Sequence, residues 1–172
     1  MGFVLLMFAG FFLLYGVLQA KHPVIYFQDK KSTVSGDFNG DGKKEKVVEK
    51  TSYKNMGCIT RISFEGKIKI APIIDTGSFV SFIRNEGDLD ELPGDEITVY
   101  WSSCEASEWM GGAVYGYREG SWMLQASFSV YGNPQLHDYV EKDKFNPRTI
   151  IVEENFWQAD TMSSRKKKII LK

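Results

Sequence analysis

Asp37-Phe-Asn39-Gly-Asp41-Gly-Lys43-Lys-Glu45 is the most informative stretch of this sequence. Oxygen-bearing side chains stand at its positions 1, 3, 5 and 9, and the two glycines between them permit a tight backbone turn. A hard divalent cation takes about 6–8 oxygen ligands at about 2.3–2.6 Å. The stretch therefore predicts a calcium-binding loop.

The residues after this loop decide what kind of structure it belongs to. An EF-hand carries a bidentate glutamate at position 12, where this chain has Val48. Residues 46–53 are rich in β-branched and aromatic side chains and favour a strand over a helix. We therefore expect a loop that enters a β-sheet, and we exclude a helix–loop–helix site.

A second stretch of the same build, Gly87-Asp-Leu-Asp-Glu-Leu-Pro-Gly-Asp-Glu-Ile97, follows fifty-one residues later and aligns without a gap on residues 36–46. Its candidate metal ligands are Asp88, Asp90 and Glu96. Leu92 stands where the first loop has Asp41, so this copy has lost one ligand and should bind more weakly. Two matched loops at this distance form an internal repeat, which is typical of repeat architectures.

Residues 36–53 and, less closely, residues 87–101 resemble the calcium loops of FG-GAP/VCBS repeats, the units of integrin-type β-propellers. The chain is similar in this respect to uncharacterised secreted bacterial proteins of that type. The resemblance implies that Ca²⁺ is held by Asp37, Asn39, Asp41, the carbonyl of Lys43, and Glu45. The alternative is a pair of acidic, glycine-rich turns that bind no metal.

The remainder of the chain is dominated by short strand-like runs separated by turn residues. The expected strands are 24–28, 45–53, 58–64, 67–70, 78–84, 95–101, 112–118, 121–128, 148–157 and 166–171. Glycine-containing hairpin turns are expected at 66–67 and 118–121, and one helix at 135–143. The prediction is an all-β fold of FG-GAP/VCBS-like units, an incomplete or divergent β-propeller-like sheet array.

The N-terminus predicts export. Residues 2–18 are uncharged and apolar, which suits a signal peptide or a short membrane anchor. We expect residues 1–20 to be that segment, with cleavage after Ala20, and residues 21–172 to be a single β-rich domain that is secreted or periplasmic. Membrane attachment would run only through residues 2–18 if they are not cleaved. The net charge of −1 gives no indication of nucleic-acid binding.

The two cysteines, Cys58 and Cys104, are expected to be bridged in an exported protein. Each follows one of the two loops and lies in or just after a strand-like run, so equivalent places in adjacent repeats would bring them together. Two buried free thiols are the alternative.

Asp75-Thr76-Gly77-Ser78 spells the active-site signature of aspartic proteases. That chemistry needs two carboxylates that share a proton, so a chain with one such motif must dimerise. It also needs a later apolar-apolar-Gly strand, and the runs 149–152 and 168–171 lack the glycine. We therefore expect a calcium-binding exported module without catalysis, which binds an unidentified protein or glycan at the cell envelope, and we keep the single-lobe protease as the alternative.

Overall fold

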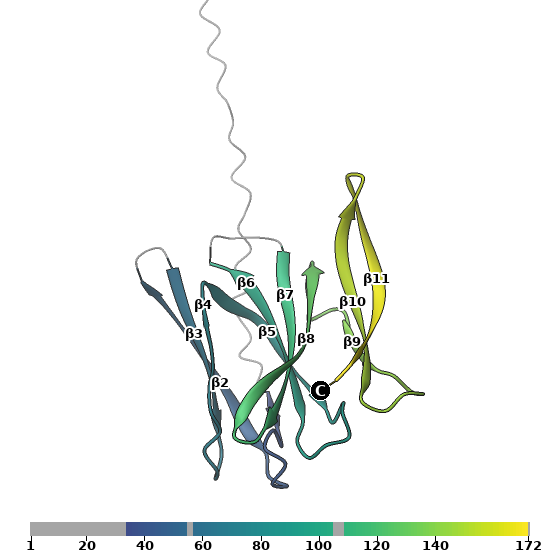
Figure 1. The fold of residues 1–172 in the computed structure, drawn as a ribbon. Helices are drawn as coiled ribbons and strands as arrows, with labels where there is room; N and C mark the ends of the chain where they lie inside the picture. The colour runs from purple at the N-terminus through teal and green to yellow at the C-terminus, as the bar shows by residue number, and fades with distance from the viewer. Residues whose placement is uncertain (1–33, 55–56, 105–108, 172) are drawn as a thin grey trace, which may run out of the picture.

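The computed structural model describes residues 34–54, 57–104 and 109–171, in which every regular element is a β-strand. The strands form three antiparallel sheets that follow one another along the chain and stand side by side (Figure 1). The prediction of an all-β fold is confirmed.

The first sheet has the spatial order β1 (Ser35–Gly36), β2 (Glu45–Lys54), β3 (Gly57–Glu65) and β4 (Ile73–Thr76). Successive side chains of a strand point to opposite faces. Along β3, every second residue from Cys58 to Phe64 is accordingly buried, and the residues between them are more accessible. One face of this sheet therefore contributes to the core and the other faces solvent.

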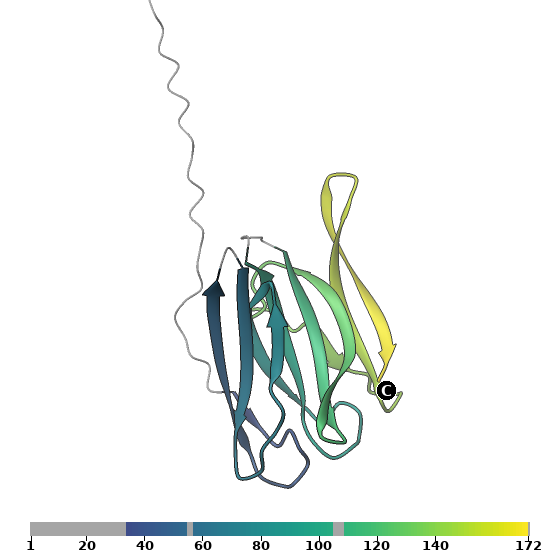
Figure 2. The same ribbon diagram turned by 60° about the vertical axis from the view of Figure 1, so that its left-hand side comes forward.

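The second sheet has the order β5 (Ser78–Gly87), β6 (Glu96–Ser103), β7 (Trp109–Arg118) and β8 (Ser121–Tyr131). It stands between the other two sheets, so both of its faces are covered (Figure 2). The strand β6 is consequently buried at almost every position. The hairpin predicted between β7 and β8 is present, with positive φ angles of 50° at Glu119 and 84° at Gly120.

The third sheet has the order β11 (Thr161–Ile170), β10 (Thr149–Gln158) and β9 (Val140–Lys142). The paired strands β10 and β11 form a long hairpin whose tip projects beyond the second sheet (Figures 1 and 2). In all three sheets, strands adjacent in space are adjacent in sequence. Each sheet is therefore a meander, and the sheet is the repeated unit of the chain.

Two hydrophobic cores hold the sheets together. The core between the first and second sheets contains Phe38, Val47, Ile62, Phe64, Ile70, Ile73, Ile83, Ile97 and Val99. The core between the second and third sheets contains Leu89, Tyr100, Val114, Ala126, Phe128, Val130, Tyr139, Val140, Ile150, Val152 and Leu171. Burial of a large apolar side chain contributes about 1.5–3 kcal/mol, so these two layers supply most of the stabilisation of the fold.

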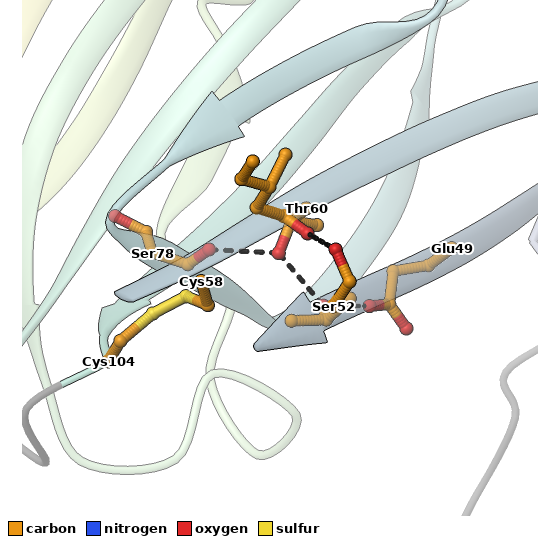
Figure 3. Close-up of a disulfide and its surroundings, with 8 residues drawn as sticks. Glu49, Ser52, Cys58, Thr60, Ser78 and Cys104 are labelled. Atoms are coloured by element: carbon orange, nitrogen blue, oxygen red, sulfur yellow. Dashed lines mark hydrogen bonds between the residues drawn. A yellow bond between two sulfur atoms is a disulfide. The ribbon is translucent and has the colours of Figure 1, made fainter. Parts of the chain in front are cut away.

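A disulfide joins Cys58, at the start of β3, to Cys104, directly after β6, with the Cα atoms 6.2 Å apart (Figure 3). The predicted bridge is confirmed. The crossing from β4 to β5 lies against it, because Gly77 donates its N–H to the Cys58 carbonyl (2.8 Å) and its own carbonyl accepts from the Cys104 N–H (3.1 Å). The disulfide thus links the first sheet covalently to the second.

Two of the predicted elements were wrong. The helix expected at 135–143 is replaced by turns and by β9, because Tyr139 and Val140 enter the core and their backbone pairs with β10. The strand expected at 67–70 is irregular, and β3 instead pairs with β4, which lies outside the expected strands. Ile70 enters the core and the Ala71 carbonyl accepts a hydrogen bond from Trp122 Nε1 (2.7 Å), so this segment serves tertiary packing.

The expected strand at 24–28 and the expected export segment at 1–20 lie outside the described residues. Within the described residues, no helix has the length and apolar character needed to cross a membrane.

Replacement of both Cys58 and Cys104 by alanine should lower the free energy of unfolding by about 3–4 kcal/mol, because the bridge closes a long chain loop and restricts the unfolded state. Urea unfolding of the variant and of the oxidised protein measures the difference. Reductant should lower the stability of the wild type and leave the variant unchanged. Two reactive thiols in unfolded, unreduced protein from its native export route would contradict the bridge.

Candidate functional site

The connection between the first and second strand of each sheet is an acidic loop. We call residues 37–45 the first loop, 88–96 the second loop and 143–149 the third loop. All three lie at the lower end of the molecule in Figure 1, and the start of β3 and the end of β6, which the disulfide links, lie at the opposite end. The third loop is two residues shorter than the others, so it does not align with them without a gap.

The first loop turns its side-chain oxygens inward onto its own backbone. Asp37 accepts from the N–H groups of Asp41 (3.0 Å) and Gly42 (2.8 Å). Asn39 Oδ1 accepts from Asp41 N–H (3.0 Å), and Asp41 Oδ1 accepts from Lys43 N–H (2.8 Å). The predicted ligands at positions 1, 3 and 5 therefore converge on one turn, while Lys43 lies on its exposed side.

Glu45 closes the first loop from the start of β2. Its side chain is only 1% exposed, and its Oε2 accepts from the Phe38 N–H (3.0 Å). Burial raises the pKa of Glu45, the Phe38 N–H opposes that shift, and the charges of Asp41 and Asp37 raise the pKa further. The loop therefore brings a buried carboxylate close to two other acids.

Two polar atoms in the first loop are buried without a hydrogen-bond partner among the described residues, Asp41 Oδ2 and Asn39 Nδ2. A buried polar atom without a partner costs about 1–3 kcal/mol. In the described part of the chain, Asp37, Asp41 and Glu45 also form no ion pair. The set offers oxygen donors and excess negative charge, which is the donor chemistry that a hard cation requires.

The second loop repeats this hydrogen bonding at matched positions. Glu96 Oε2 accepts from Leu89 N–H (2.7 Å), as Glu45 does from Phe38 in the first loop. Asp90 Oδ1 accepts from Leu92 N–H (2.9 Å), as Asn39 does from Asp41. The residues at position 2, Phe38 and Leu89, each enter the core between that sheet and the next.

The three predicted ligands of the second loop, Asp88, Asp90 and Glu96, have carboxylate oxygens within 4.8 Å of one another. A cationic side chain already lies among them. Arg118 Nη2, from the end of β7, is 2.6 Å from Asp90 Oδ2 and 2.6 Å from Glu96 Oε1. The corresponding positions of the first loop hold Asp37, Asn39 and Glu45, and its additional acid is Asp41.

The charges of the second loop are strongly coupled. Burial raises the pKa of Glu96 to about 7, while the Leu89 N–H and Arg118 act against that rise and Asp90 adds to it. Burial opposes the charged guanidinium of Arg118, but its hydrogen bonds and its attraction to Asp90 and Glu96 outweigh this effect, so the pKa of Arg118 is raised. The guanidinium stays charged and neutralises the acids around it.

The sequence reading missed a glycine that each loop requires. A Cβ atom at Gly66 would lie 2.7 Å from Glu45 Cγ, and one at Gly116 would lie 3.1 Å from Glu96 Oε1. These glycines follow the closing glutamates by 21 and 20 residues respectively; Gly66 comes directly after β3, and Gly116 lies on β7. A glycine at this spacing is the signal that would have extended the repeat beyond the loops.

The first and second loops also contact each other closely. A Cβ atom at Gly40 would lie 2.8 Å from the Pro93 carbonyl carbon, and one at Gly94 would lie 2.8 Å from the Phe38 carbonyl oxygen. Asp95 donates its N–H to the Asp37 carbonyl (2.7 Å), and its carboxylate accepts from the Asp37 N–H (3.1 Å). The conformation of the first loop is therefore coupled directly to that of the second loop, which leads into β6.

The protease-like motif lies at the other end of the same pair of sheets. Asp75 belongs to β4, at the edge of the first sheet, and Gly77 makes the crossing beside the disulfide. Asp75 Oδ1 is buried without a hydrogen-bond partner among the described residues. Its charge raises the pKa of the nearby Tyr115 phenol, after the larger effect of that phenol's burial.

Comparison with models of protein families, with curated proteins and with solved structures found no match to this chain.

The contact between the loops can be tested with two glycines of the first loop. Gly40 (φ 72°) and Gly42 (φ 81°) both have a left-handed backbone, but only Gly40 has neighbours where a Cβ would stand. Gly42→Ala should cost about 1–2 kcal/mol from backbone strain alone. Gly40→Ala should cost about 1–3 kcal/mol more, because the added methyl overlaps Pro93. Urea unfolding measures both, and equal losses would contradict the loop contact.

Proposed function

We propose that the first loop binds one Ca²⁺ ion, and that the chain is a calcium-stabilised, exported binding module without catalysis. The observation that carries this proposal is Asp41 Oδ2, a buried carboxylate oxygen without a partner among the described residues. It stands in a loop whose other acids, Asp37 and Glu45, also lack a positive partner there. A bound cation would satisfy the oxygen and neutralise the excess charge together.

The residues that would hold the ion are Asp37, Asn39, Asp41 and Glu45 through their side chains and Lys43 through its carbonyl. The ion would supply positive charge, and its effect would be structural. It would hold the turn that places Phe38 in the core and would fix the face of the loop that contacts Gly94 and Asp95. Calcium would thereby strengthen the junction of the first and second sheets.

Calcium binding is tested by thermal unfolding of metal-free protein with and without added CaCl₂. At a calcium concentration of about 100 times Kd, mass action stabilises the folded state by about 2.7 kcal/mol, which corresponds to a rise in Tm of about 5–10 °C. Asp41→Asn keeps the shape of the side chain and its Oδ1 acceptor but removes the charge. This variant should lose most of the calcium-dependent rise.

The matched control is Asp160→Asn in the turn between β10 and β11. It also removes one negative charge, and asparagine tolerates the positive φ of 61° at this position. This variant should keep the full calcium response. A wild-type Tm that is unchanged by calcium, or a response that survives Asp41→Asn intact, would refute the proposed site.

The biological role that we propose is recognition of a protein or glycan at the cell envelope. It rests on the predicted export segment at 1–20 and on the resemblance of the loops to those of adhesion-type repeats. Recovery of the calcium-loaded chain with its bound partners from envelope extract, compared with the Asp41→Asn variant, tests it. N-terminal sequencing of the native protein decides separately whether the chain begins near Lys21.

The enzyme alternative, a single-lobe aspartic protease, rests on the unpartnered oxygen of Asp75. Its chemistry would require a second copy of the chain to supply the other carboxylate. Pepstatin-sensitive cleavage of a denatured protein substrate at acid pH, lost in Asp75→Asn, would establish it. Absence of cleavage would remove this alternative and leave the calcium proposal untouched.

A further inference from the structure

The three loops neutralise their acids in different ways. In the third loop, Asp143 is paired with Lys168 of β11 (2.7 Å). In the second loop, Asp90 and Glu96 are paired with Arg118 of β7. Both basic residues come from the third strand of their own sheet. In the first sheet that strand is β3, and none of its residues forms an ion pair with the first loop in the described structure.

The surroundings of Arg118 are those of a bound cation. Its guanidinium is held by oxygen atoms: Asp90 Oδ2, Glu96 Oε1, the Tyr117 carbonyl (2.8 Å) and, at 3.4 Å, the Pro93 carbonyl. The side chain is only 14% exposed, and the Asp90 and Glu96 side chains are fully buried. Oxygen atoms of the loop and the adjoining strand thus accept hydrogen bonds from one buried positive charge.

Two other residues, Gly116 on β7 and Leu92 in the second loop, are consistent with a side-chain cation in that place. Gly116 leaves room beside Glu96, and its missing Cβ would stand 3.5 Å from the Arg118 guanidinium carbon. Leu92 occupies the position at which the first loop has the ligand Asp41. At the matched ligand positions each loop has three acids, but only the acids of the second loop are paired with a basic side chain among the described residues.

We propose that Arg118 is the resident cation of the second loop, so that this loop is complete without metal and the chain takes one Ca²⁺ ion instead of two. The inference rests on the proposed function for its account of the first loop. Arg118 is then the residue that decides which of two similar loops responds to calcium. A tethered guanidinium cannot be removed by a chelator, so the second loop should stay ordered when the first loop loses its ion.

Binding stoichiometry tests this assignment with a matched pair of variants, Asp37→Asn and Asp88→Asn, which change the same position of the two loops. Metal-free protein is titrated with CaCl₂ in a calorimeter. The expected result is one site in the wild type, none in Asp37→Asn and one of unchanged affinity in Asp88→Asn. Two sites in the wild type, or one site that is lost in Asp88→Asn, would overturn the role of Arg118. No site in the wild type would instead refute the proposed function.

A second experiment tests Arg118 directly in the Asp37→Asn background, in which the first loop is expected to bind no calcium. Arg118→Gln removes the positive charge, and the exposed Arg165→Gln serves as its control. Arg118→Gln should lower Tm well below that of the control, and millimolar calcium should restore part of the loss, because the vacated carboxylates can then take a metal ion. Arg118→Lys, which keeps the charge, should show no calcium response.

Each outcome of this second experiment leads to a different conclusion about Arg118. A Tm equal to that of Arg165→Gln would show that the guanidinium neutralises nothing and would refute the proposal. A fall in Tm that calcium does not reverse would refute the part of the proposal in which Arg118 stands in a metal position. If Arg118→Gln yields no folded protein in either buffer, the stoichiometry of the Asp37→Asn and Asp88→Asn pair decides alone.

Discussion

The close contact between the first two acidic loops is the constraint on which much of this structure depends. Gly40 lies against Pro93, Gly94 lies against the Phe38 carbonyl, and Asp95 exchanges hydrogen bonds with the backbone of Asp37. The backbones approach too closely for a side chain at either glycine. Because each loop also places its second residue in a core, a change in the turn of the first loop displaces the packing of two sheets.

The first and second sheets are consequently held at both ends. At one end the loops interlock, and at the other the disulfide joins Cys58 to Cys104 with Gly77 hydrogen-bonded between them. The junction of the second and third sheets has a different construction. There the apolar core is accompanied by polar links: Tyr131 donates its N–H to Asn155 Oδ1 (2.9 Å), and Lys142 Nζ donates to the Asp88 carbonyl (3.2 Å). Both junctions thus combine an apolar core with polar contacts, and the first junction also carries the disulfide.

Electrostatics distinguishes the loops more than backbone shape does. A buried carboxylate is costly unless a positive charge accompanies it, so each loop that buries an acid needs a cation. The third loop uses Lys168 and the second uses Arg118. The first loop has three acids, Asp37, Asp41 and Glu45, and no such side chain among the described residues. Our calcium proposal therefore follows from the one member of the series whose charge the described residues leave uncompensated.

The sequence by itself determined the strand-rich class, the positions of the longer strands, the two matched loops and the bridged cysteines. These features depend on local patterns: alternation along β3, a left-handed turn at Gly120, or acids spaced along one loop. Only the tertiary structure decided that 139–142 is extended, that β4 pairs with β3, and that Arg118 reaches Glu96 from a strand twenty-two residues further on. Those outcomes depend on which surfaces meet across a core, and the free energy of such long-range contacts overrides local preference.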